Sequence, residues 1–519
     1  MPTLNWIGKD KVVNHHLDVP FRVLEEQYTY GDNADGNMII HGDNLDALKA
    51  LLPRFEGRVK CIYIDPPYNT GNEGWVYNDN VNDPKIRKWL GEVVGREGED
   101  LSRHDKWLCM MYPRLKLLYK LLAENGAIFI SIDGNEYTNL KAICDEVFGI
   151  SHYVDTIVWQ KRTSPDARKI FSTGHEYVLV YSKSLDADAV FRYLPLDEND
   201  MASYTNPDND PRGPWISSPF TAPGFRPNQM YAMITPSGKT MLPPKGRCWC
   251  NIEEVYQQLL SEGRMWFGAD GNGVPRRKTY LCERAGKGIW TWWTNAEVGY
   301  TQEATQETAQ ILGKAVFDYP KPVRLIQRII QMAADPDSIV LDSFAGSGTT
   351  AHAVLSLNKK DGGHRRIILV ELGDYAENIT AERVRRVITG YGEGKKAVEG
   401  TGGGFSFYEL GAPLMIDGNL NPDVPETRIR EYVYYTETRL PMPPASESEP
   451  HLLGVHNRAA YYFYYLSDAV TTLNEAFLRT IRTEADSYMI YADINALDEA
   501  TMKRHHITFK KIPRDITLL

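Results

Sequence analysis

The sequence of 519 residues lacks the features that mark membrane and secreted proteins. No apolar run approaches the roughly 20 residues that cross a bilayer. The first residues show no charged segment followed by an apolar one, as a signal peptide would. The six cysteines are scattered and form no disulfide framework, which fits a reducing compartment. We therefore expect a cytoplasmic protein that does not contact a membrane.

Metal ligands and excess basic charge are also scarce. Cys248 and Cys250 form a C-x-C pair without a second pair at zinc spacing, so we expect no metal site. The chain has 58 Lys and Arg against 68 Asp and Glu, a formal net charge of −10. This charge argues against sequence-independent wrapping of nucleic acid, although it is compatible with a local basic cleft.

A strand–helix alternation indicates an α/β fold. Apolar runs predict strands at 38–41, 59–64, 127–132, 157–159, 177–181, 338–342 and 367–371. Helical periodicity predicts helices around 45–52, at 104–124 with an interruption or restart at Pro113, at 137–148 and at 323–332. Such alternation predicts parallel pairing in a sheet that helices cover on both faces.

Composition divides the chain into four predicted segments. Pro, Gly, Asn, Asp and aromatic residues break the alternation at 186–315, which indicates a separate loop-rich or mostly β module. Residues 1–185 and 316–395 would then be two parts of one α/β domain. A Gly-rich linker at 390–404 precedes aromatic runs, so residues 396–519 are predicted to form a C-terminal α+β domain.

The first chemical motif, Asp65-Pro66-Pro67-Tyr68, directly follows the predicted strand 59–64. The two prolines stop the strand and fix a stiff, extended corner. In an open α/β sheet, ligands bind at the carboxyl ends of the strands. A carboxylate beside a flat aromatic ring suits a planar group with an amino function, such as a nucleobase, although a polar turn would also fit.

The second motif is the glycine-containing loop 342–351, which follows one predicted strand and opens a helix. Gly346, Gly348 and Ala351 satisfy the pattern G-x-G-x-x-G/A, and Glu371 ends the next strand 20 residues later. The glycines let the backbone approach a ligand, and the acidic residue accepts from ribose hydroxyls. The loop therefore indicates a nucleoside-containing cofactor, with a tight strand–helix turn as the alternative. No lysine follows Gly348, so a phosphate-binding P-loop is not expected.

The two motifs together suit an S-adenosylmethionine-dependent enzyme that methylates an amino group. Their order, with Asp65-Pro66-Pro67-Tyr68 ahead of the loop 344–348, resembles the β class of amino-methylating DNA methyltransferases. More narrowly, the chain resembles the modification subunits of type III restriction–modification systems in the stretches 63–72, 41–44, 319–322, 344–350 and 509–515. The resemblance implies a Rossmann-like methyltransferase fold with a mixed, mostly parallel sheet, a circularly permuted motif order and an inserted target-recognition domain at 186–315.

This resemblance also implies a reaction, the transfer of a methyl group to N6 of an adenine flipped out of duplex DNA. Asp65 and the Pro66 carbonyl would accept from the amine at the corner that Pro67 completes, and Tyr68 would stack on the base. The cofactor would contact Asp43, Lys321, Pro322, Asp342, Phe344, Gly346, Ser347, Gly348, Thr349 and Glu371. Alternatively, Asp43 is only a helix N-cap, Pro322 only a helix start and Lys321 only a solvated lysine.

Duplex DNA is the expected partner, and a homodimer and a restriction helicase–nuclease subunit are further candidates. The candidate DNA contacts, each of which could be a solvated side chain instead, are Arg162, Arg168, Lys169, Arg276, Arg277 and Lys278. Residues 69–79 are either a lid over the pocket or a plain surface loop. Cytosine-N4 methylation and a non-catalytic recognition role in a restriction complex stay open as alternatives.

Overall fold

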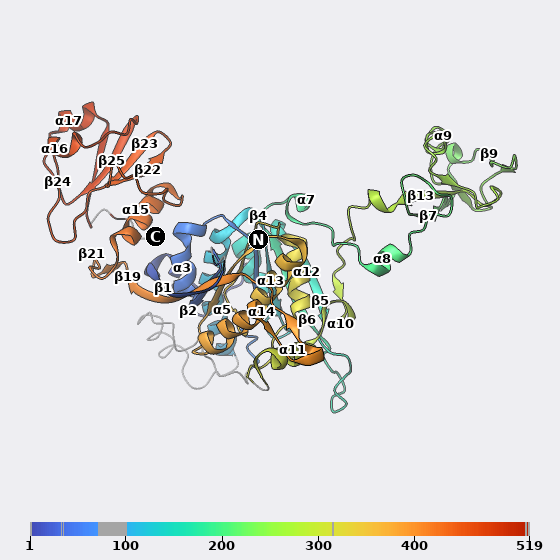
Figure 1. Ribbon diagram of the computed structural model, residues 1–519, viewed down its shortest axis with the longest axis horizontal. Helices are drawn as coiled ribbons and strands as arrows, with labels where there is room; N and C mark the ends of the chain where they lie inside the picture. Colours follow the sequence, from blue (N-terminus) through green and yellow to red (C-terminus); the bar gives the residue numbers. More distant parts are fainter. Residues whose placement is uncertain are drawn as a thin grey trace. The chain divides into compact units, whose positions relative to one another are not determined.

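The computed structural model describes residues 3–32, 34, 36–70, 101–313, 316–513 and 516. The chain divides into a larger unit, residues 1–192 with 290–519, and a smaller unit, residues 193–289. Figure 1 shows the elements of both units, which are described separately below. Within the described ranges, no helix has the length and the apolar character needed to cross a membrane.

A ten-stranded mixed sheet is the centre of the larger unit, with the order β1-β19-β2-β16-β15-β3-β4-β6-β5-β14. Pairing is parallel from β19 through to β4 and between β5 and β14. It is antiparallel for β1 with β19, β4 with β6 and β6 with β5. The strands are β1 (Arg22–Gly31), β2 (Met38–His41), β3 (Val59–Ile64), β4 (Leu122–Ile132), β5 (Tyr153–Gln160), β6 (His175–Ser182), β14 (Trp292–Trp293), β15 (Ile339–Asp342), β16 (Arg366–Glu371) and β19 (Gly404–Pro413).

The predicted mixed, mostly parallel sheet is therefore present, with two corrections. The strands predicted at 157–159 and 177–181 pair antiparallel, because the hairpin 161–174 joins them where a parallel pair would need a crossover. The outer strands β1 and β19 were not predicted. Although β19 lies beyond the Gly-rich stretch, it pairs with β2 inside the main sheet.

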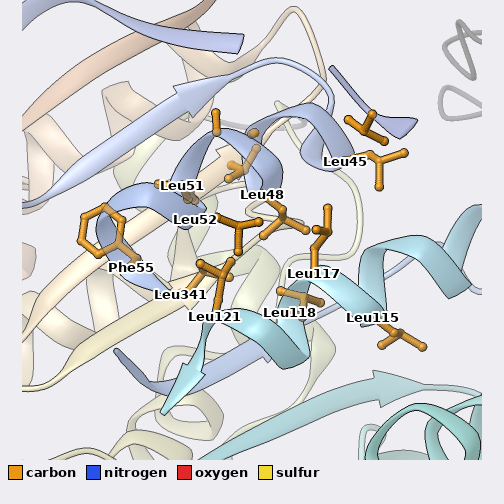
Figure 2. Packing of buried hydrophobic residues seen from close by; sticks show 14 of the residues in the cluster. Leu45, Leu48, Leu51, Leu52, Phe55, Leu115, Leu117, Leu118, Leu121 and Leu341 are labelled. Carbon is orange, nitrogen blue, oxygen red and sulfur yellow. The ribbon is translucent and has the colours of Figure 1, made fainter. Parts of the chain in front are cut away.

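Two groups of helices pack against this sheet. The first contains α3 (Asn44–Phe55), α5 (Leu101–Leu121) and α6 (Tyr137–Phe148), and the second contains α12 (Val323–Ala333), α13 (Thr349–Asp361) and α14 (Glu382–Thr389). Figure 2 shows Leu48 and Leu51 of α3 against Leu118 and Leu121 of α5, near Leu341 of the sheet, and all five are fully buried. The interruption predicted at Pro113 is wrong, since α5 continues through that residue.

The larger unit also holds a four-stranded sheet of β22 (Leu452–His456), β23 (Ala459–Phe463), β25 (Ser487–Ala492) and β27 (Ile507–Lys511). Its last three strands pair in parallel. Helix α15 (Glu426–Thr438) contacts β22, β23 and α3, which joins this sheet to the rest of the unit. The remaining elements of the unit are α1 (Lys9–Val12), α2 (His15–Asp18), α7 (Ala187–Val190), α10 (Asn295–Val298), α11 (Thr301–Leu312), β17 (Gly390–Tyr391), β18 (Val398–Glu399), β20 (Met415–Ile416), β21 (Asn419–Leu420), β24 (Thr472–Leu473), α16 (Glu475–Leu478), β26 (Ile494–Asn495) and α17 (Glu499–Arg504).

The smaller unit is built from short strands, loops and few helices. Its apolar core includes Phe220, Trp249, Tyr256 and Phe267. Its elements are α8 (Glu198–Ala202), β7 (Trp215–Pro219), β8 (Thr221–Pro223), β9 (Met233–Ile234), β10 (Thr240–Met241), β11 (Arg247–Trp249), α9 (Glu253–Ser261), β12 (Met265–Trp266) and β13 (Arg276–Tyr280).

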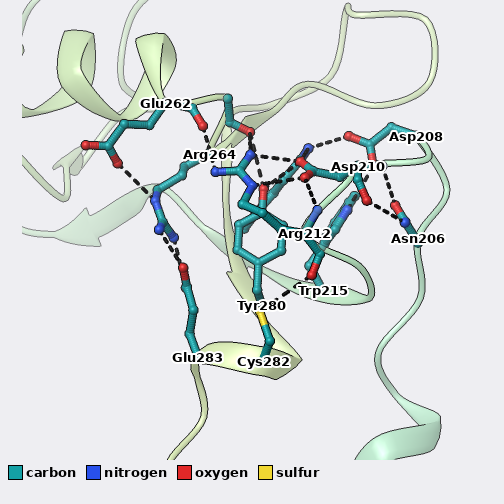
Figure 3. A network of polar contacts seen from close by, with 12 residues as sticks. Asn206, Asp208, Asp210, Arg212, Trp215, Glu262, Arg264, Tyr280, Cys282 and Glu283 are labelled. Atoms are coloured by element: carbon teal, nitrogen blue, oxygen red, sulfur yellow. Dashed lines mark hydrogen bonds and ion pairs between the residues drawn. The ribbon is translucent and has the colours of Figure 1, made fainter.

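A polar network adds to the core of the smaller unit (Figure 3). The Asp210 carboxylate accepts from the Tyr280 hydroxyl at 2.7 Å, from Arg212 Nε at 2.9 Å and from Lys278 Nζ at 3.0 Å. Lys278 also pairs with Asp208, which accepts from Trp215 Nε1 at 2.8 Å. The charged and polar groups of this network therefore form hydrogen bonds or ion pairs with one another, as charged groups inside a protein require.

Candidate active site

Strand directions bring distant residues to one edge of the large sheet. Asp65 follows β3, while Asp342 and Glu371 end the parallel strands β15 and β16. Strand β5 ends at this edge and the antiparallel β6 begins there, so Lys161 and Glu176 reach it as well. All five side chains line one cavity of about 1140 Å³. In an open α/β sheet, this is the edge at which ligands bind.

The corner that follows β3 presents a carboxylate oxygen to this cavity. Asp65 Oδ2 accepts from Lys321 Nζ at 2.5 Å. Asp65 Oδ1 is buried and has no hydrogen-bond partner among the described residues. Trp107 Nε1 donates to the Pro67 carbonyl at 2.7 Å and so holds the corner in place. The corner therefore has one unused buried acceptor, which a ligand with an N–H group would satisfy.

Lys321 is a charged group within the cavity. Its Nζ lies 3.8 Å from Glu176 Oε2 and 5.0 Å from the centre of the Tyr68 ring. Burial lowers the pKa of Lys321, but Asp65 and Glu176 raise it by more, so its pKa stays above the usual value. Burial raises the pKa of Asp65, and Lys321 opposes that shift. The Lys321 ammonium therefore favours the ionised form of Asp65.

Glu176 connects the charged and aromatic parts of the site. Its Oε2 accepts from the Tyr68 hydroxyl at 3.0 Å, and its Oε1 accepts from Lys161 Nζ at 2.7 Å. Burial alone would raise the pKa of Glu176, but Lys321 and Lys161 together hold it below the usual value. Sequence reasoning missed Glu176 and Lys161. The available signal was a single carboxylate directly before the apolar and aromatic run 177–181.

The glycine-containing loop lies against Glu371 at the same edge. Gly346 N donates to Glu371 Oε2 at 2.7 Å, and Gly373 N donates to Oε1 at 2.9 Å. Gly346 and Gly348 have φ values of 51° and 80°. A Cβ atom on Gly348 would lie 3.1 Å from the Thr380 carbonyl oxygen. The loop thus needs glycine for both its conformation and its close packing.

Asp342 is buried beneath this loop. Its carboxylate accepts from Phe344 N at 3.0 Å and from Thr350 Oγ1 at 2.5 Å. Burial raises the pKa of Asp342 to about 7, although these two hydrogen bonds oppose the shift. Asp342 therefore titrates near neutral pH.

The structure brings most of the predicted site residues together. Besides those described above, the cavity wall includes Pro66, Pro67, Tyr68, Phe344, Ser347, Thr349, Arg162, Arg168 and Lys169. Of the described residues that were predicted to bind the cofactor, three do not line this cavity: Asp43, Pro322 and Gly348. Asp43 caps α3, accepting from Leu45 N at 2.7 Å, and pairs with Arg114 at 2.8 Å. Pro322 is the N-cap residue of α12.

The other three candidate DNA contacts lie in the smaller unit. Lys278 is buried between Asp208 and Asp210, and the Arg276 guanidinium donates to Ser217 Oγ at 2.7 Å. Both cations are therefore committed to partners inside the unit, whereas Arg277 is exposed. The predicted lid at 69–79 lies outside the described residues from position 71 onward, as do Arg514 and Asp515 of the stretch 509–515.

Comparison with known proteins identifies the family. A family model for DNA methylases of the N6/N4 type matches residues 59–382, which include the corner, the glycine loop and Glu371. The chain belongs to the N6/N4 DNA methylase family. The resemblance drawn from the motifs is thereby confirmed, and S-adenosylmethionine, the predicted cofactor, is the methyl donor of this family.

The relatives of this methylase include restriction–modification proteins. The Mod subunit of the type III enzyme StyLTI from Salmonella typhimurium is 38% identical over 396 residues, which is 73% of this chain. That match covers 59% of the subunit's length, so the chain spans less than two thirds of this relative. The type II methyltransferase M.KpnI from Klebsiella pneumoniae is 33% identical over 365 residues, 65% of this chain and 81% of the relative.

Among solved structures, a DNA modification methylase from Thermus thermophilus in complex with S-adenosyl-L-methionine is similar to this methylase at a TM-score of 0.34. It is 16% identical, and the match covers 72% of this chain and 99% of the other.

The residues of the cavity fit this cofactor. Glu371 and Asp342 offer carboxylate oxygens to hydroxyl and amino groups, and Phe344 and Pro320 offer apolar surface. A Cβ at Gly346 would lie 3.1 Å from Phe317, so a larger residue there would crowd the wall of the cavity where glycine does not.

Proposed function

We propose that this methylase transfers a methyl group from S-adenosylmethionine to N6 of an adenine that has been flipped out of duplex DNA. The observation that carries the proposal is the buried, unpartnered Asp65 Oδ1 beside the Tyr68 ring. An exocyclic amine on a planar base supplies the missing donor and stacks on the ring. Asp rather than Ser at position 65 favours adenine over cytosine by resemblance.

Asp65 and the Pro66 carbonyl act on the nucleophile. The N6 lone pair of adenine is delocalised into the ring, which makes the amine a poor nucleophile. By accepting from both N–H groups, the two oxygens favour a pyramidal nitrogen whose lone pair is localised. Tyr68, whose hydroxyl Glu176 holds at 3.0 Å, fixes the plane of the base. Catalysis then depends on positioning and electrostatics rather than on a covalent intermediate.

Lys321 and Asp65 also handle the proton. The bound cofactor supplies an electrophilic methyl group, and the methylated nitrogen must lose one proton. Lys321, at 2.5 Å from Oδ2, favours the ionised form of Asp65 before the reaction. Because burial raises the pKa of Asp65, its free Oδ1 is a suitable acceptor for that proton afterwards.

The cofactor is assigned to the second half of the cavity. Glu371 would accept from its ribose hydroxyls while still holding the amides of Gly346 and Gly373, since each carboxylate oxygen has a second lone pair. Asp342, Ser347 and Thr349 line the same wall.

The remaining parts of the chain are assigned to DNA recognition. The module predicted at 186–315, which contains the unit 193–289, would read the target sequence. Arg162, Arg168 and Lys169 line the cavity and would contact phosphates, and Arg277 would do so from the smaller unit. Similarity to type III Mod subunits supports a restriction subunit as a further partner, and a homodimer is part of the same proposal.

Methyl transfer from labelled S-adenosylmethionine to duplex DNA tests this function. We expect transfer by the wild type and by the exposed control Asp486→Asn. We expect Asp65→Asn to lower the turnover number at least about 100-fold. The Asn side chain has no negative charge, and an N–H donor replaces one of the two acceptor oxygens of Asp65. Cofactor affinity, measured by calorimetry, should be retained. Transfer by Asp65→Asn at the wild-type rate would refute the mechanism.

A further inference from the structure

The hairpin 161–174 between β5 and β6 exposes two large apolar side chains at its tip. Ile170 is 99% exposed and Phe171 is 93% exposed. The base of the hairpin is closed by a hydrogen bond from Lys161 N to the Gly174 carbonyl at 2.9 Å. Adjacent apolar side chains that are almost completely exposed indicate a surface that something else covers.

The tip is an ordered turn. Asp166 N donates to Ser172 Oγ at 2.8 Å, and Lys169 N donates to the Asp166 carbonyl at 3.0 Å. The Asp166 carboxylate binds the Arg168 guanidinium at 2.9 Å. These contacts close the turn on both sides of Ile170 and Phe171, so the fold presents the two side chains outward.

The hairpin begins and ends at the candidate active site. Lys161, the first residue of the hairpin, and Glu176, two residues after its end, contact each other beside Tyr68, and the hairpin extends beyond the ends of β5 and β6 (Figure 1). Five hairpin residues line the same cavity as Asp65: Lys161, Arg162, Asp166, Arg168 and Lys169. Lys169 immediately precedes Ile170. The exposed pair is therefore attached to the wall of the cavity that would receive the target base.

We propose that Ile170 and Phe171 form a wedge that enters the base stack of duplex DNA beside the target base, an inference that rests on the proposed function. Taking a base out of the helix breaks its stacking, and apolar side chains inserted at such a step stabilise the distorted duplex. Lys169 adjoins the wedge in the chain and Arg162 lies at the base of the same hairpin, so both would supply positive charge for the adjoining phosphates, while Arg168 is paired with Asp166. Apolar tips flanked by cations match a DNA duplex better than an apolar protein surface.

Two DNA substrates distinguish a wedge from a general DNA contact. Both are oligonucleotide duplexes that carry the sequence modified by the wild type, and in one of them the target base faces an abasic site. We expect the double variant Ile170→Ser with Phe171→Ser to methylate the fully paired duplex at least about 10-fold more slowly, because the wedge no longer offsets the unstacking of the target base. On the abasic duplex, where the base is already unpaired, its rate should match that of the wild type.

Matched variants complete the experiment. Val470→Ser, at a side chain that is 70% exposed elsewhere in the larger unit, should leave both rates unchanged. Phe171→Trp should retain activity on the paired duplex, because it keeps a large flat wedge. Equal rates for the double variant and the wild type on the paired duplex would overturn the wedge, as would equal losses on both substrates. A wild type that transfers no methyl group to any duplex DNA, so that no modified sequence can be found, would overturn the proposed function itself.

Discussion

At the scale of the residue, the site depends on a row of alternating charges. Lys161, Glu176, Lys321 and Asp65 follow one another, with 2.7 Å, 3.8 Å and 2.5 Å between the paired atoms. Lys161 and Lys321 lower the pKa of Glu176, while Lys321 lowers and Glu176 raises the pKa of Asp65. Glu176 is thus a positioning residue that acts through Tyr68 and Lys321.

The variant Glu176→Gln tests this role. Gln removes the negative charge that raises the pKa of Asp65, so the acid limb of the pH–rate profile should move to lower pH. The turnover number should fall about 10-fold as Tyr68 and Lys321 lose their partner, with cofactor affinity unchanged. The exposed control Glu124→Gln should change neither quantity. An unmoved acid limb in Glu176→Gln would contradict the charge coupling.

Asp342 should make stability depend on pH. Its pKa of about 7 in the folded protein lies above the value of about 3.9 expected in the unfolded chain. Between these values the folded state binds a proton that the unfolded state has released, so stability falls as pH rises and is lowest above pH 7. In Asp342→Asn this titration is absent. The free energy of unfolding of the variant minus that of the wild type, measured in urea, should therefore be more positive at pH 8 than at pH 5. A difference in unfolding free energy that does not depend on pH would refute the assignment.

Some residues of the site could be predicted from the sequence, and others could not. We could predict Asp65, Gly346 and Glu371 from the sequence because each occupies a fixed place relative to one strand end. Local sequence marks strand ends. Glu176 meets Tyr68 across 108 residues of sequence. This contact arises only from the order of β3, β4 and β6 in the sheet, which local pattern does not specify.

At the scale of the element, burial determined which predictions succeeded. The fully buried strand β3 and the helix α6 have the bounds predicted from their apolar periodicity. The outer strand β1 has a largely exposed pattern with three successive exposed residues, 25–27, and such strands lack the apolar run that was used to find strands. Pro113 is tolerated within α5, so tertiary packing overrides the local cost of proline there.

Two glycines at the ends of α13 differ in how tightly their surroundings pack. Gly348 and Gly362 both have a left-handed backbone, with φ of 80° and 71°. A Cβ at Gly348 would lie 3.1 Å from Thr380 O, whereas a Cβ at Gly362 would meet nothing within 4 Å. We expect both alanine variants to lose about 1 kcal/mol from backbone strain. Only Gly348→Ala should also weaken cofactor binding in calorimetry, and equal affinities in the two variants would contradict the packing argument.

At the scale of the whole molecule, the two units have separate cores. The smaller unit is stabilised by the Phe220 cluster and by the network around Asp210, and neither includes residues of the larger unit. All the residues that line the cavity belong to the larger unit. A substitution that breaks the polar network of the smaller unit should therefore leave the cofactor site intact.

Lys278→Met tests this separation. It leaves Asp208 and Asp210 without their shared cation, and unpairing a buried charge costs about 3 kcal/mol. In calorimetry we expect a transition of the smaller unit to move to lower temperature, while that of the larger unit and the cofactor affinity are unchanged. The exposed control Lys239→Met should show no shift. Loss of cofactor binding in Lys278→Met would show that the units depend on each other.

The base that reaches the Asp65 corner determines which modified nucleoside forms. We would digest DNA from cells that express the protein and identify the methylated nucleosides by mass spectrometry. We expect N6-methyladenine with the wild type and none with Asp65→Asn. N4-methylcytosine in place of N6-methyladenine would contradict the adenine assignment, and the same methylation with Asp65→Asn would contradict the catalytic role of the corner.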